Sequence, residues 1–117
     1  AAVSGQPGIR RAVADRLDDV IRACEAIRRY IDDERVPEDV VHDAVRMRLV
    51  EIGEAVRVLP AGVTASEPGI PWSRVSDLGE RLTRRYFDTT RALVVGTART
   101  DVPHLADAAR RLRAAHY

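Results

Sequence analysis

Three arginines lie close together in the second half of the chain. Arg84 and Arg85 follow Arg81 by three and four residues, which places all three on one face of a helix. Guanidinium groups bind phosphates and carboxylates through paired hydrogen bonds, so the cluster is a candidate clamp for an anion. A solvated helix end, in which these arginines pair with Glu80 and Asp77, explains the spacing equally well. The residues alone leave both interpretations open.

The residue types that usually carry acid–base, nucleophilic or metal chemistry are few and scattered. His42, His104 and His116 are isolated from one another, and one cysteine, Cys24, allows neither an internal disulfide nor a cysteine metal cluster. Cys24 falls in an apolar stripe, which favours a place in the core over a role as nucleophile. Trp72 follows a proline-rich loop and is also more typical of core than of a ligand platform. We therefore expect no metal, no other cofactor and a reducing, cytoplasmic environment.

The composition indicates a single soluble domain built from helices. Of the 117 residues, 45% are hydrophobic, 32% are charged and 4% are aromatic, which is too apolar for disorder and too charged for a membrane span. Aliphatic and charged residues dominate, which favours a helical bundle. The net charge of +1 indicates no broad basic surface, so any contact with RNA would be local. No signal peptide or membrane anchor is visible.

Two long helices are expected in the first half. Residues 1–8 are small and polar and predict a flexible leader. From residue 9 to about residue 33, apolar residues recur every three or four positions, as in an amphipathic helix. Proline and two acids predict a second helix over residues 37–59, and Gly53 inside it indicates close helix packing or a site. The short connection predicts that the two long helices are antiparallel.

The second half predicts shorter helices. Residues 60–71 contain three prolines and two glycines and predict a loop. A helix is expected over residues 72–86, and residues 88–90 offer a cap for the next one. Residues 100–103 predict a further helix start. The fold class is therefore all-α, a four- or five-helix bundle with residues 9–117 as its single domain.

Three stretches are similar to the HepT-like branch of the HEPN superfamily. RLVEIGEAVRVLP at 48–60 resembles the family's second-helix signature, and PGIPWSRV at 68–75 resembles the entry to the third helix. The segment at 78–105 resembles the end of the family's catalytic helix and its closing motif. The resemblance implies an HEPN-type bundle, a homodimer, and a minimal nucleotidyltransferase encoded beside it. It also implies that many members are metal-independent ribonucleases.

The family's ribonuclease motif is incomplete in this chain. The motif is an arginine, four to six residues, a histidine, one residue and a tyrosine. Alignment from Trp72 puts Gly79 in place of the arginine, Arg84 in place of the histidine, and Tyr86 at the tyrosine. An imidazole can take a proton from a ribose 2′-hydroxyl near neutral pH, whereas a guanidinium cannot. His42 reaching across a dimer is an alternative source of imidazole.

From this departure we expect a protein that is not an enzyme and has no catalytic residue. The expected function is a HepT-like antitoxin, a homodimer that binds and neutralises a cognate nucleotidyltransferase toxin in a type II-like pair. The alternative is an HEPN ribonuclease toxin with rearranged catalytic residues, regulated by a nucleotidyltransferase antitoxin, and only this alternative involves RNA. The resemblance puts the partner-binding or degenerate active-site cleft at Glu54, Arg81, Arg84, Arg85 and Tyr86, with Tyr86 as the candidate target of nucleotide modification.

Overall fold

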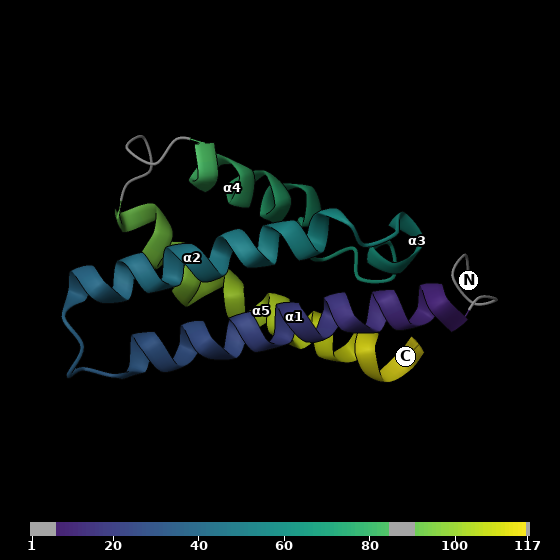
Figure 1. Ribbon diagram of the computed structural model, residues 1–117, viewed down its shortest axis with the longest axis horizontal. Helices are drawn as coiled ribbons and strands as arrows, with labels where there is room; N and C mark the ends of the chain where they lie inside the picture. The colour runs from purple at the N-terminus through teal and green to yellow at the C-terminus, as the bar shows by residue number, and fades with distance from the viewer. Residues whose placement is uncertain (1–6, 85–90, 117) are drawn as a thin grey trace.

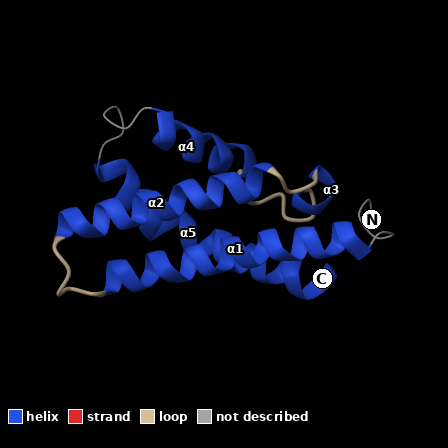
Figure 2. Cartoon of the chain, viewed as in Figure 1, coloured by secondary structure: helices blue, strands red, loops and turns tan. Residues whose placement is uncertain are grey.

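The computed structural model of the chain describes residues 7–84 and 91–116. Every regular element in these ranges is a helix (Figure 1 and Figure 2). In chain order the helices are α1 (Pro7–Asp32), α2 (Glu38–Arg57), α3 (Ala61–Thr64), α4 (Trp72–Arg84) and α5 (Arg91–His116). The expected all-α bundle of four or five helices is confirmed.

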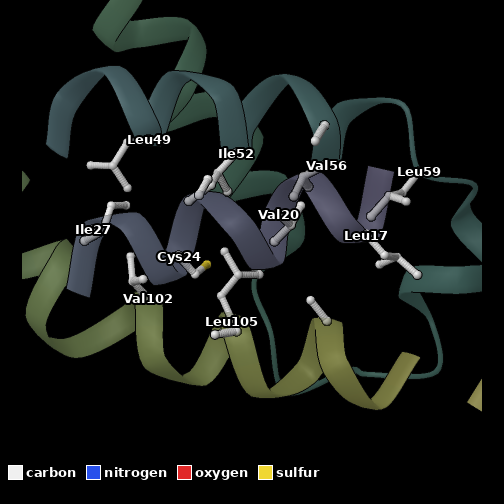
Figure 3. Packing of buried hydrophobic residues seen from close by; sticks show 14 of the residues in the cluster. Leu17, Val20, Cys24, Ile27, Leu49, Ile52, Val56, Leu59, Val102 and Leu105 are labelled. Carbon is white, nitrogen blue, oxygen red and sulfur yellow. The ribbon is translucent and has the colours of Figure 1, made fainter. Parts of the chain in front are cut away.

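The two long helices α1 and α2 are antiparallel, as expected (Figure 1). The apolar stripe of α1 is buried, and Leu17, Val20 and Ile27 are 0% exposed. Leu49 and Ile52 of α2 are buried in the same cluster, which Figure 3 shows between α1, α2 and α5. Full burial of one such side chain stabilises a fold by about 1.5–3 kcal/mol. The aliphatic stripes therefore determine how the long helices pair.

Helix α5 packs on α1 and, less extensively, on α2, and it continues through Pro103. We expected a new helix to start at residues 100–103, and that prediction was wrong. Buried residues follow at helical spacing on both sides of the proline: Val94, Ala98, Val102, Leu105, Ala109 and Leu112. Pro103 lies on the exposed face of α5. A proline inside a helix costs about 3 kcal/mol, and burial along the opposite face outweighs that cost.

Helix α4 packs almost entirely on α2. Its first residue, Trp72, is half-buried against the edge of the core, and its indole Nε1 donates a hydrogen bond to the carbonyl oxygen of Glu67 at 3.0 Å. This contact fits the interpretation of Trp72 as a packing residue. Because α4 rests on one helix, the contact between α2 and α4 decides where the α4 side chains lie.

Several element boundaries differ from the expected ones. Helix α1 begins at Pro7, inside the expected 1–8 leader, because proline is favoured in the first helical turn, where its missing N–H has no partner in any case. Residues 61–64, expected as loop, form the one-turn helix α3 because Val63 is buried against the core. Helix α2 ends at Arg57, two residues earlier than expected. The expected cap at 88–90 lies outside the described residues.

Candidate functional site

Helices α2 and α4 cross at two glycines. A methyl group on Gly53 would lie 2.8 Å from the Cα atom of Gly79, and one on Gly79 would lie 2.9 Å from the Cα atom of Gly53. An ordinary contact between carbon atoms is roughly 3.5–4.0 Å. The interpretation of Gly53 as a point of close helix packing is therefore confirmed. Gly79, which aligns with the motif arginine, faces the backbone of α2, where a larger side chain would separate the helices.

A groove of about 440 Å³ lies along this crossing. Glu54 and Arg57 of α2, and Thr83 and Arg84 of α4, line its sides. Two residues of the expected cleft, Glu54 and Arg84, thus belong to the same groove. The Nη2 atom of Arg84 lies 3.0 Å from Oε1 of Glu80 in an exposed ion pair within α4.

The other residues of the expected cleft do not join this groove in the described part of the chain. Arg81 is exposed and is not among the lining residues, and it forms no ion pair with the residues described. Arg85 and Tyr86 lie outside the described residues. The pair between Arg84 and Glu80 is what a solvated helix end produces, while the guanidinium of Arg81 faces solvent and can bind an anion.

A buried arginine fixes the C-terminal end of α4. Arg46 of α2 is 6% exposed, and its Nη2 donates a hydrogen bond to the carbonyl oxygen of Leu82 at 2.9 Å. Leu82 lies two residues before Arg84, the last residue of α4. The sequence reasoning missed Arg46. Its spacing of three residues from Leu49 and seven from Gly53 was the available signal, because it puts Arg46 on the side of α2 that faces α4.

His42 lies one helical turn before Arg46 and is not a solvated histidine. Its side chain is 12% exposed, and its Nδ1 lies 3.3 Å from Oδ1 of Asp43. Its Nε2 is buried and has no hydrogen-bond partner among the residues that the structure describes. His104 of α5, in contrast, is exposed. The first half of α2 therefore carries one buried cation, Arg46, and one imidazole whose Nε2 atom is buried.

The thiol of Cys24 belongs to the core. Cys24 is 2% exposed, and burial raises the pKa of its thiol to about 12, so the group stays protonated and is a poor nucleophile. This confirms the sequence interpretation. Within residues 7–84 and 91–115, no three His, Cys, Asp or Glu side chains are placed to hold a metal ion. None of the described helices is long and apolar enough to cross a membrane.

The fold is an all-α helical bundle, which is consistent with the HEPN type. The model of the family described as Ribonuclease HepT-like matches residues 18–112 of the chain. The chain therefore belongs to the HepT-like family, and the resemblance read from its three motifs is confirmed.

Two curated proteins are similar to the chain over most of its length. One, from Methanocaldococcus jannaschii, has a name that combines two activities, gamma-glutamylcyclotransferase and, provisionally, RNase. It is 27% identical over 103 residues, which are 85% of this chain and 46% of that protein. The other, from Thermococcus cleftensis, is named as a probable ribonuclease HepT. It is 29% identical over 110 residues, which are 90% of this chain and 99% of that protein. No solved structure matches the chain.

The comparisons contradict the prediction that this protein is not an enzyme. The names of both relatives include the term ribonuclease or RNase. These names point to RNA cleavage as an activity of the family. The prediction relied on Gly79 and Arg84, which are both in α4. It weighed His42 only as a residue reaching across a dimer, and it did not consider Arg46, which α2 brings to the end of α4.

Proposed function

We propose that this chain is the ribonuclease-type member of a toxin–antitoxin pair and that a nucleotidyltransferase is the partner that controls it. The observation that carries the proposal is the family match over residues 18–112, together with the ribonuclease names of two relatives. The groove between α2 and α4 supports it, because Arg57 and Arg84 on its sides can bind the phosphates of an RNA strand.

The surface around the end of α4 is the proposed contact for the transferase. Arg81 and Arg84 are exposed there, and Arg85 continues the cluster in the sequence. A nucleotidyltransferase gathers carboxylates to hold magnesium, so its active-site rim is acidic and complementary to guanidinium groups. In this proposal Tyr86, which lies outside the described residues, is the residue that the transferase modifies with a nucleotide.

A homodimer is part of the same proposal. Val40 and Met47 are 49% and 60% exposed and lie seven residues apart on α2, which places them on one face of the helix. Exposed apolar side chains aligned in this way are typical of interfaces between protein chains.

A second candidate function is that of an antitoxin that binds and neutralises the transferase. The contact between Gly79 and Gly53 favours it, because the position aligned with the motif arginine is occupied by helix packing. The two candidates use the same partner and the same surface, and they differ in which member of the pair harms the cell.

Expression in a bacterial host separates the two candidates. If the proposal holds, this chain alone arrests growth and degrades cellular RNA, and co-expression of the transferase encoded beside it restores growth. If the transferase alone arrests growth and this chain relieves the arrest, the antitoxin role replaces the proposal. A pair in which neither member affects growth contradicts both.

The contact surface has its own test with a matched control. The double change of Arg81→Glu and Arg84→Glu should abolish co-purification with the transferase, because it places carboxylates against an acidic rim. The change Arg99→Glu, at an exposed arginine of α5, should leave co-purification intact. Equal binding by all three proteins would move the interface elsewhere.

A further inference from the structure

One atom of the His42 imidazole, Nε2, is buried in a way that needs an explanation. This atom has almost no solvent contact and no hydrogen-bond partner among the described residues. Leaving a buried polar atom without a partner costs about 1–3 kcal/mol. Such atoms in folded proteins are rare, and they often belong to functional groups.

The neighbouring carboxylate determines which nitrogen of His42 carries the proton. Oδ1 of Asp43 lies 3.3 Å from Nδ1, and an ionised carboxylate can only accept a hydrogen bond. In the neutral ring Nδ1 is therefore the donor and Nε2 keeps its free electron pair. A carboxylate that orients an imidazole while the other nitrogen is free is the arrangement of a general base.

The position of His42 along α2 relates it to the end of α4. Gly53 of α2 meets Gly79 of α4, and Arg46 meets Leu82, so the two helices run antiparallel. One turn beyond Arg46, His42 lies past Leu82 in the direction in which α4 ends. This is the end of α4 where Arg84 stands in the place of the motif histidine. The imidazole that α4 lacks is thus present on the neighbouring helix.

We propose that His42 is the catalytic base of this chain, that Asp43 orients its ring, and that Arg46 is a positioning residue for the end of α4. The inference rests on the proposed ribonuclease function and adds the group that moves the proton. Because Nε2 is covered in the free protein, binding of RNA has to uncover it.

The proposed step is a transesterification within the RNA. Nε2 of His42 takes the proton of a ribose 2′-hydroxyl, and the 2′-oxygen forms a bond to the adjacent phosphorus. The bond from phosphorus to the 5′-oxygen breaks, and its electron pair stays on that oxygen, which takes a proton from water. The imidazolium then returns its proton to the hydroxide that is left. The products are a 2′,3′-cyclic phosphate and a 5′-hydroxyl, and no oxidant or reductant is consumed.

The test compares His42→Gln with the wild-type chain on a 5′-labelled single-stranded RNA. Glutamine keeps a polar side chain of similar length but cannot take up a proton near neutral pH. Cleavage should fall at least about 100-fold, since a general base contributes roughly 10²–10⁴-fold to a rate. The control His104→Gln, at an exposed histidine of α5, should cleave within about twofold of wild type. RNA with a 2′-deoxy sugar at the cleaved position should not be cut by any of them.

A second variant separates a lost base from a lost fold. His42→Ala with added imidazole should regain part of the activity, whereas Arg46→Met with added imidazole should regain none. Far-ultraviolet circular dichroism establishes that each variant is still helical. If His42→Gln cleaves like wild type, the role of His42 is refuted while the ribonuclease function stands. If the wild-type chain cleaves no RNA, the proposed function fails and the inference fails with it.

Discussion

The crossing of α2 and α4 predicts a large effect from one added methyl group. In Gly79→Ala the new Cβ would lie 2.9 Å from the Cα atom of Gly53, about 0.6 Å or more inside an ordinary carbon contact. Rotation of a side chain cannot relieve this contact, because both groups belong to or branch from the backbone. The helices must separate, and α4 has little other packing to hold it. Overpacking of this kind costs about 1–3 kcal/mol, while alanine gains about 1 kcal/mol over glycine in helix propensity.

We therefore expect Gly79→Ala to lower the free energy of unfolding by up to about 2 kcal/mol, which lowers the thermal midpoint by up to about 8 °C. Gly96→Ala is the matched control, because a Cβ at Gly96 in α5 meets nothing within 4 Å. It should raise the free energy of unfolding by about 0.5–1 kcal/mol. Thermal and urea unfolding followed by circular dichroism measure both. Equal stabilisation by the two changes would refute the close crossing and the role assigned to Gly79.

Three further predictions follow from the core and the surface. Arg46→Met should lower the free energy of unfolding by about 1–3 kcal/mol, because the carbonyl of Leu82 loses its hydrogen-bond donor. Urea unfolding should show that the exposed control Arg81→Met lowers this free energy by less than about 0.5 kcal/mol. Cys24 should resist a thiol reagent at pH 8 until urea unfolds the chain. Fast reaction of the folded protein would contradict the burial of Cys24. Because burial raises the pKa of this thiol from 9.0 to about 12, the stability that the neutral thiol contributes is complete below pH 9 and declines as the pH rises toward 12. Met47→Glu should shift light scattering from the mass of a dimer to that of a monomer, and an unchanged mass would exclude this face of α2 from the interface.

The apolar stripes made most of the fold predictable from the sequence. In α1, residues such as Leu17 and Ile27 recur at helical spacing, and their burial sets which face meets α2. The same logic failed at Pro103, because a local signal for a helix start competes with burial on both sides of it. Burial decided the outcome, and local propensity did not.

The candidate site was less predictable, because it depends on which charged and polar side chains are buried and on what they contact. The sequence marks Arg46 and His42 as ordinary members of a charged helix, whereas the fold buries Arg46 against the carbonyl of Leu82 and leaves the His42 side chain only 12% exposed. Glu54 and Arg84 were placed together on the strength of a family resemblance, and both do line the groove along the glycine crossing. The missing motif residues directed attention mainly to α4, and in α2 the sequence analysis considered Glu54 and a His42 reaching across a dimer but not Arg46.

RNA cleavage by the purified chain is the most direct test of the proposed ribonuclease function. The protein is incubated with a 5′-labelled single-stranded RNA, with and without the cognate nucleotidyltransferase, and the ends of the fragments are identified by mass spectrometry. We expect cleavage by the chain alone, fragments that end in 2′,3′-cyclic phosphate, and suppression of cleavage by the transferase. RNA that stays intact at micromolar concentrations of a folded, helical protein would contradict the proposed function.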